Sequence, residues 1–136
     1  MAEKAKKSEA FVFAAGYTAA SNSFKAAVTA FNKVPMDTNA LSKVLDPNVV
    51  LYGISTQQIV AQGRNGPNGV VAYLKANLSG CNFAPISTKY QPTTWPISVS
   101  GTARWTDNDG SPQDTINYEF TFDTTPAALI LTLWAS

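Results

Sequence analysis

Residues 97–122 read ISVSGTARWTDNDGSPQDTINYEFTF, and apolar and polar side chains alternate on both sides of the central DNDG. A period of two is typical of a strand with one buried face, and Asp-Gly is typical of a tight hairpin turn. If Asp109 and Gly110 are the two central turn residues, three pairs of residues on the apolar face lie opposite each other: Val99 and Phe120, Gly101 and Tyr118, and Ala103 and Ile116. The segment therefore predicts a long antiparallel hairpin with one face in the core.

The pair formed by Gly101 and Tyr118 places an aromatic ring over a glycine. A glycine inside a strand often marks a bend or a place where another group approaches the backbone closely. We therefore expect the sheet to bend at Gly101 and to leave room there.

Further strands surround this hairpin, and no helical pattern follows residue 84. A first strand is predicted at 86–90, and Pro92 and Pro96 interrupt the strand pattern that follows it. The last strand, residues 128–134, is apolar on both faces, which indicates a central or covered position in the sheet.

The first half of the chain is mostly helical. Apolar residues at steps of three and four predict mostly helical structure over about 9–32, which Ser21-Asn22-Ser23 could split into two helices. A short helix begun by Thr38 carries Leu41, Val44 and Leu45, and a third helix that bears Val70, Val71, Leu74 and Leu78 is closed by Gly80. Between the second and third helices, 49–54 and 59–63 read as two arms of a hairpin. The fold class is therefore α+β.

Composition indicates one globular domain, from residue 9 to residue 136, after a flexible basic tail at 1–8. Of the 136 residues, 45% are hydrophobic and 14% are charged, and the net charge is +1. So small a charge argues against nucleic acid as a partner, and no apolar run is long enough to predict a membrane span. Residues 10–20 have the outline of a secretory signal, but Glu3 and Glu9 spoil its basic region, so we favour the cytoplasm and keep secretion as the alternative.

The chain has one cysteine, Cys81, and no histidine. This composition excludes an intramolecular disulfide, a thiolate metal cage, a Ser/His/Asp triad and a histidine-ligated metal. We expect neither a metal nor a cofactor.

Two motifs carry a family resemblance over nearly the whole chain. These are the segment 45–51, LDPNVVL, between a helix and a strand, and the segment 63–66, GRNG, before the third helix. With the order of elements, they resemble the nuclear transport factor 2 family, including its SnoaL-like branch. The resemblance implies a cone, in which a strongly curved, mainly antiparallel sheet wraps around N-terminal helices packed in its concave face, with a pocket between them.

The resemblance also implies a range of activities, because the family contains isomerases, dehydratases, cyclases, epoxide hydrolases and proteins that only bind. Its steroid isomerase branch places a basic aspartate where this chain has Tyr52-Gly53, which argues against proton abstraction of that type. Such proteins often form homodimers through the outer sheet face, and we expect the same here.

Candidate site residues come from the predicted pocket face. Its strands carry no carboxylate, because Glu119 points to the opposite face, and the aspartates at 107, 109 and 123 belong to turns. Arg64 could reach the pocket mouth, although a solvated arginine is the plainer interpretation. Aromatic side chains, most with a polar tip, suit a planar or apolar ligand: Tyr17, Tyr52, Trp105, Tyr118, Phe120 and Trp134.

Two hypotheses follow. In the first, the domain binds an apolar small molecule in its pocket, and it could act on that molecule as an isomerase, lyase or cyclase. In the second, it is a non-catalytic dimerising module that binds other proteins. Neither the ligand nor a reaction is fixed by the residues.

Overall fold

The computed structural model describes residues 18–52, 58–91, 97–123 and 128–135. Its elements are a helix over 18–32, α2 (Thr38–Val44), β1 (Leu45–Tyr52), β2 (Ile59–Gln62), α3 (Val70–Leu78), β3 (Asn82–Gln91), β4 (Ile97–Thr106), β5 (Pro112–Phe122) and β6 (Ile130–Ala135). The predicted tail at 1–8 and the start of the first predicted helix lie outside the described residues.

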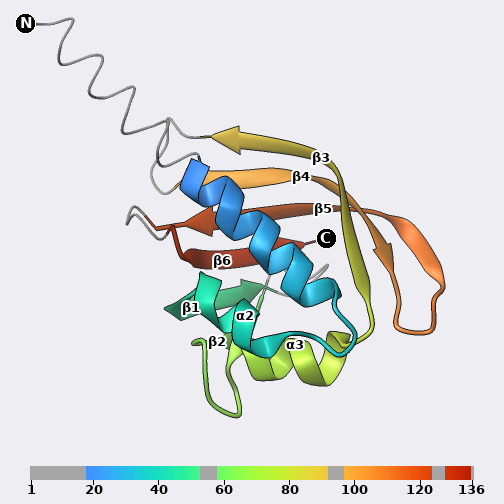
Figure 1. Cartoon of the computed structure of the whole chain (residues 1–136), viewed down its shortest axis with the longest axis horizontal. Helices are drawn as coiled ribbons and strands as arrows, with labels where there is room; N and C mark the ends of the chain where they lie inside the picture. The colour runs from blue at the N-terminus through green and yellow to red at the C-terminus, as the bar shows by residue number, and fades with distance from the viewer. Residues whose placement is uncertain (1–17, 53–57, 92–96, 124–127, 136) are drawn as a thin grey trace, which may run out of the picture.

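The strands form one six-stranded sheet in the order β2-β1-β6-β5-β4-β3. All neighbouring strands are antiparallel except β1 and β6, which are parallel. The sheet curves around the helix over 18–32, while α2 and α3 lie below this helix, beside β1 and β2 (Figure 1). The predicted α+β architecture, with helices in the concave face of a curved sheet, is confirmed.

The central hairpin has the predicted register. Val99 pairs with Phe120, Gly101 with Tyr118, and Ala103 with Ile116. Val99 and Ala103 are fully buried, whereas Glu119, on the other face, is exposed. The alternation in the sequence was therefore sufficient to assign both faces.

The space over Gly101 is occupied by two other groups of the protein. A Cβ atom at this position would lie 2.1 Å from the carbonyl oxygen of Ser87 and 3.1 Å from the Tyr118 hydroxyl. The ladder between β3 and β4 shifts register between Pro85 and Ser87, so the strand next to Gly101 is irregular. The predicted bend is thus a site of close approach between three strands.

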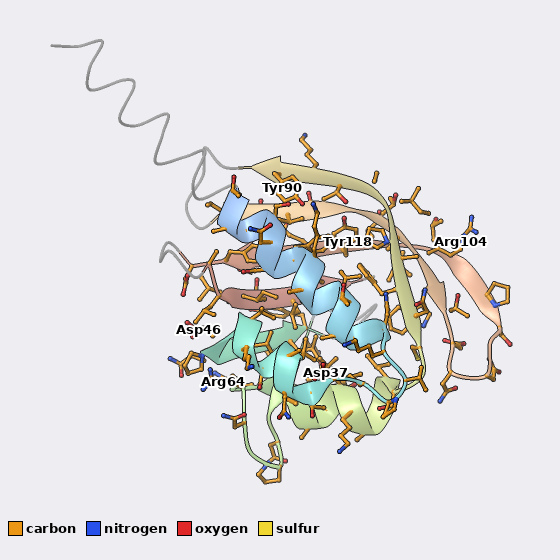
Figure 2. The ribbon with its side chains drawn as sticks, viewed as in Figure 1. Asp37, Asp46, Arg64, Tyr90, Arg104 and Tyr118 are labelled. Atoms are coloured by element: carbon orange, nitrogen blue, oxygen red, sulfur yellow. The ribbon has the colours of Figure 1, made fainter. Side chains whose placement is uncertain are left out.

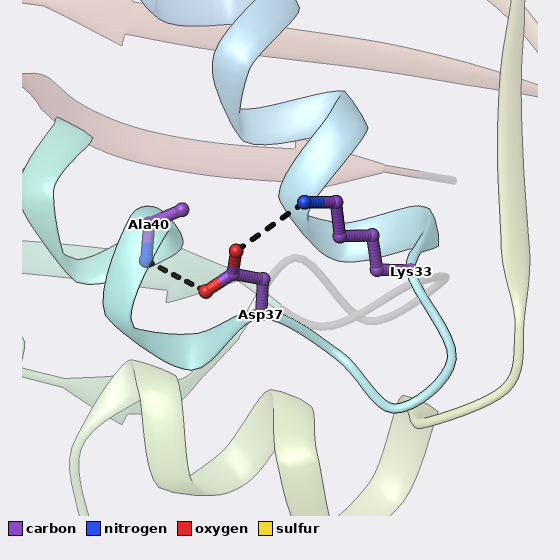
Figure 3. Close-up of polar contacts among 3 residues, drawn as sticks. All are labelled: Lys33, Asp37 and Ala40. Atoms are coloured by element: carbon purple, nitrogen blue, oxygen red, sulfur yellow. Dashed lines mark hydrogen bonds and ion pairs between the residues drawn. The ribbon is translucent and has the colours of Figure 1, made fainter.

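Two details of α2 differ from the sequence prediction. Asp37, not Thr38, is the N-cap: its Oδ1 accepts a hydrogen bond from the Ala40 amide at 3.0 Å, and its Oδ2 lies 3.5 Å from Lys33 Nζ (Figure 3). Leu45 belongs to β1 rather than to the helix, because its backbone is already extended, with φ −98° and ψ 136°. The chain therefore leaves the helix one residue before Asp46-Pro47.

The position of β6 agrees with its sequence. This strand lies between β1 and β5, so both of its sides are paired, as its apolar character on both faces predicted. In the part of the chain that the structure describes, no helix has the length and hydrophobicity needed to cross a membrane.

Candidate functional site

A cavity of about 340 Å³ lies between the helices and the concave face of the sheet. The three helices contribute Ala27, Val28, Phe31, Leu41, Tyr73, Leu74 and Leu78 to its wall. The strands contribute Leu45, Leu51, Tyr52, Val60, Phe83, Trp105, Phe120, Ile130 and Leu133. Every described helix and strand thus provides part of the lining.

The exposure of the lining residues distinguishes the floor of the cavity from its mouth. Leu45 and Ile130 are fully buried, and Leu41 and Leu74 are nearly so. Val60, on the edge strand β2, is 38% exposed. We infer that the cavity reaches the surface beside β2.

Aromatic rings form much of the wall and contact one another. The rings of Phe31 and Trp105 are 5.7 Å apart, and those of Phe83 and Phe120 are stacked at 6.2 Å. The indole Nε1 of Trp105 donates a hydrogen bond to Asp107 Oδ1 at 2.9 Å. This bond holds the orientation of the indole ring and uses its one polar donor.

Among the described lining residues, Tyr52 and Tyr73 carry hydroxyl groups. Neither hydroxyl has a hydrogen-bond partner among the described residues. In the same residues, every side-chain nitrogen or oxygen that is buried does have a partner. The two hydroxyls must therefore be accessible to solvent or to a bound molecule.

The structure brings together three of the six aromatic residues predicted for the site: Tyr52, Trp105 and Phe120 line the cavity. Tyr118 is not part of the lining. It lies beside the helix over 18–32 (Figure 2). Its ring is stacked on that of Phe24, with 5.6 Å between the ring centroids. Tyr17 lies outside the described residues, and so does the side chain of Trp134, whose backbone pairs with Glu119.

The hydroxyl of Tyr118 is engaged in the sheet. It donates to the Ser87 carbonyl at 2.8 Å and lies 3.0 Å from the Thr88 hydroxyl oxygen. Burial raises the pKa of this phenol above its ordinary value, so the group is neutral over the physiological range.

Sequence reasoning missed Phe31, Tyr73 and Phe83 as lining residues. Phe31 fits the apolar spacing of the first predicted helix, but this spacing does not tell which of the apolar residues borders a cavity. Tyr73 was not assigned to the apolar side of α3, although Val70 and Leu74, three residues before and one after, are buried there. Phe83 lies just before the segment where the period of two was recognised.

The described carboxylates have other roles. Asp37 caps α2, and the side chains of Asp46, Asp109 and Asp123 accept the backbone amides of Asn48, Ser111 and Leu129. Asp107 holds Trp105, and Glu119 is exposed on the outer face. Across the described ranges, histidine, cysteine, aspartate and glutamate side chains form no group of three that could hold a metal ion.

Arg64 lies behind the wall of the cavity. Its side chain is half-buried beside β1 (Figure 2). Its Nη1 donates to the Leu45 carbonyl at 3.4 Å. Arg64 itself is not a lining residue. The arginine thus contacts the backbone of a lining residue rather than the space inside.

Comparison with known proteins gives a likeness in structure alone, because no family model and no curated protein matches the chain. A putative isomerase from Bacillus subtilis aligns with a TM-score of 0.64 at 10% identity, covering 88% of this chain and 86% of the other. A putative polyketide cyclase from Sinorhizobium meliloti gives 0.57 at 21% identity, covering 85% and 94%. An uncharacterised cystatin-fold protein from Novosphingobium aromaticivorans gives 0.57 at 13% identity, covering 85% and 95%.

Identities this low establish the fold and leave activity open. A ketosteroid isomerase-like fold from Catenulispora acidiphila, solved with trimethylamine, also aligns, with a TM-score of 0.54 at 11% identity over 84% of this chain and 83% of the other. These likenesses agree with the resemblance in the sequence. The chain has the nuclear transport factor 2-like cone fold.

Proposed function

We propose that this protein binds a small apolar or aromatic molecule in the cavity between its helices and its sheet. The observation that carries the proposal is a cavity of about 340 Å³ with a lining of aliphatic and aromatic side chains. Ligand sites have volumes of about 300–1,000 Å³ and are mostly apolar, with a few polar groups that orient the ligand. The volume here lies at the lower end of that range, which favours a compact ligand.

Three lining residues are the proposed principal contacts: Tyr52, Trp105 and Phe120. Their rings offer flat surfaces for stacking, and the bond from Trp105 to Asp107 fixes one of these surfaces in advance. Side chains that are already ordered lose less conformational entropy when a ligand binds. The structural likeness to a putative polyketide cyclase and a putative isomerase is compatible with such a ligand.

Binding is the activity that the described groups support best. Isomerase, lyase or cyclase chemistry would need a proton donor or acceptor at the ligand. The described carboxylates are engaged in caps and turns, hold Trp105 or face outward, so the hydroxyls of Tyr52 and Tyr73 are the groups that could serve. We therefore propose a binding protein, with turnover as a separate property to be measured on the ligands found.

A cavity-filling variant tests the proposal. Ala27 lines the cavity, and its neighbour Ala26 is exposed on the same helix, so Ala27→Phe and Ala26→Phe make a matched pair. A library of mono- and bicyclic aromatic compounds is screened by thermal shift. A ligand at about 100 times its Kd adds about 2.7 kcal/mol to the stability of the folded state, which raises Tm by several degrees.

We expect the wild type and Ala26→Phe to be stabilised by the same compounds, and Ala27→Phe to lose at least about ten-fold in affinity because its ring occupies the ligand's space. Circular dichroism checks that both variants are folded. Stabilisation that survives unchanged in a folded Ala27→Phe variant would place the ligand elsewhere and contradict the proposal.

The outer face of the sheet supports a second proposal, that two copies of the chain associate through it. Its residues on β4 and β5 are polar, with two charges of opposite sign among them, on Arg104 and Glu119: Ser98, Ser100, Thr102, Arg104, Thr115, Asn117, Glu119 and Thr121. A polar surface with little charge can be buried against its own copy without strong repulsion. In a non-catalytic interaction module, this face rather than the cavity would be the functional surface.

A further inference from the structure

The described residues that line the cavity carry no charged side chain. They are alanine, valine, leucine, isoleucine, phenylalanine, tyrosine and tryptophan. An ionised ligand placed there would lose its hydration without gaining a counter-charge, which is strongly unfavourable. A neutral ligand has no such penalty.

Charged groups on the surrounding elements do not offset this. Asp107 and Arg64 are bonded to the lining residues Trp105 and Leu45, but neither borders the cavity. Asp37 is engaged at the start of α2, and Asp46 accepts the Asn48 amide. The other charged side chains described on these elements are exposed: Lys25, Lys33, Lys43, Lys75, Lys89, Arg104 and Glu119.

The polar groups that could bind a ligand in the cavity are the phenol hydroxyls of two tyrosines. The hydroxyls of Tyr52, at the end of β1, and Tyr73, on α3, have no partner among the described residues. The other polar group of the lining, the Trp105 indole N–H, is already bonded to Asp107. A phenol both donates and accepts, so it fits a hydroxyl or a carbonyl oxygen on a ligand.

We infer that the cavity selects neutral aromatic molecules that carry a hydroxyl or carbonyl group, which Tyr52 and Tyr73 hydrogen-bond, and rejects their ionised analogues. This inference rests on the proposed function and specifies its ligand class. It has a consequence for pH: the affinity for an aromatic acid follows the ionisation of the ligand rather than that of a group in the protein.

Matched ligands test the selection for neutral molecules. The Kd values of 2-naphthol, 2-naphthamide, 2-naphthoate and naphthalene are measured at pH 7.5 by the quenching of tryptophan fluorescence. The amide and the carboxylate have nearly the same shape, and we expect the carboxylate to bind at least about 100-fold more weakly, because its charge is buried without a partner.

The pH dependence distinguishes the ligand's ionisation from that of the protein. Aromatic carboxyl groups have a pKa near 4 and phenols near 10. Between pH 7.5 and 5.5 the neutral fraction of the acid rises about 100-fold, so its apparent affinity should rise by about that factor. The affinity for 2-naphthol should stay constant over this interval.

A double variant tests the role of the tyrosines. Tyr52→Phe/Tyr73→Phe keeps both rings and removes both hydroxyls, and Tyr90→Phe removes a hydroxyl that binds Ser21 Oγ away from the cavity. We expect the double variant to bind 2-naphthol about 3- to 10-fold more weakly, the range for a lost hydrogen bond, with naphthalene unaffected. Tyr90→Phe should bind both ligands as the wild type does.

Each outcome bears on a different claim. Tight binding of 2-naphthoate at pH 7.5, lost in Arg64→Gln, would overturn the inference and make Arg64 a counter-ion, while the proposed function would stand. An unchanged Kd for 2-naphthol in the double variant would overturn the assignment of the tyrosines. Failure of all four compounds to bind the wild type would overturn the inference together with the proposal of an aromatic-binding cavity.

Discussion

Tyr118 is the residue that ties three strands together at the centre of the sheet. It stands on β5, its ring crosses Gly101 on β4, and its hydroxyl bonds the Ser87 carbonyl and the Thr88 side chain on β3. Its ring also contacts Phe24 on the helix and Phe120 in the cavity wall. One side chain thus connects the curvature of the sheet to the position of a lining residue.

We expect Tyr118→Phe to lower the free energy of unfolding by about 1–2 kcal/mol, because a buried hydroxyl and its hydrogen bonds are removed. Burial raises the pKa of Tyr118, so the wild type keeps this contribution below about pH 10, the ordinary phenol pKa, and loses it as pH rises through the higher folded value. Urea unfolding at pH 7 and above pH 10 measures both effects. A gap between wild type and variant that does not narrow at high pH would contradict this role.

At this scale the sequence predicted which residues face each other but not which atoms bond. The alternation on both strands placed Tyr118 and Gly101 on one face, and their pairing is as predicted. The turn itself differs from the prediction, because Gly110 N donates to the Asp107 carbonyl, which makes Asn108 and Asp109 its central residues, and the ladder shifts register between Arg104 and Thr106. The bond to Ser87 depends on the register between β3 and β4, which shifts between Pro85 and Ser87. The sequence does not specify that shift. Residues 92–96, which join the two strands, contain two prolines instead of the residues typical of a tight hairpin turn.

Among the elements, α2 shows how one charged side chain begins a short helix. Asp37 accepts the Ala40 amide, and it also forms an ion pair with Lys33, one turn earlier in the chain (Figure 3). Both Asp37 and Thr38 are good N-cap residues, so the sequence alone could not choose between them. In the structure Asp37 is the N-cap, because Thr38 is already the first residue of the helix.

The cap makes the stability of the protein depend on pH in the acidic range. The hydrogen bond from Ala40 and the nearby Lys33 lower the pKa of Asp37 below its ordinary value. A lowered pKa means that the stabilisation is complete above about pH 4, the ordinary value, and is lost as pH falls through the folded value.

We therefore expect Asp37→Asn to unfold with a weaker dependence on pH between about pH 5 and 2, because asparagine caps helices nearly as well without titrating. Thermal unfolding over this interval compares it with the wild type, and Asp46→Asn serves as the control. Parallel pH profiles for the wild type and Asp37→Asn would show that the cap does not contribute through its charge.

The parallel pairing of β1 with β6 is the element relation that the sequence did not predict. Both strands were recognised, and the two-sided apolar character of β6 indicated a central position. Their pairing joins residues more than eighty positions apart, such as Leu51 and Leu133, and no turn specifies it. It is fixed by the closure of the whole sheet around the helices.

At the scale of the whole molecule, the cavity exists because the side chains of the helices and of the curved sheet do not fill the space between them. The sequence pointed to three of the aromatic lining residues on strands, Tyr52, Trp105 and Phe120, but not to Phe83 on β3. It predicted the helical ones less well, because a helix has an apolar stripe several residues wide and the cavity borders only part of it. The sequence alone could therefore not identify Phe31 and Tyr73 as lining residues, because this depends on how the helices pack against the sheet.

The outer sheet face gives the last prediction, which concerns the assembly of two molecules. In a two-fold symmetric interface, a residue near the axis meets its own copy. Asn117 is exposed on β5 opposite Thr102, in the polar row proposed as the contact. Arginine at this position would place two like charges near each other and weaken association by at least about ten-fold.

Light scattering after size exclusion measures the mass directly. We expect the wild type to have twice the 14.5 kDa of the chain and Asn117→Arg to shift toward the single-chain mass at the same concentration. The matched control, Asn39→Arg, adds the same charge at an exposed position of α2 and should leave the dimer intact. If Asn39→Arg dissociates the dimer and Asn117→Arg does not, the two copies associate through the helical side, close to the cavity, and the outer face is free.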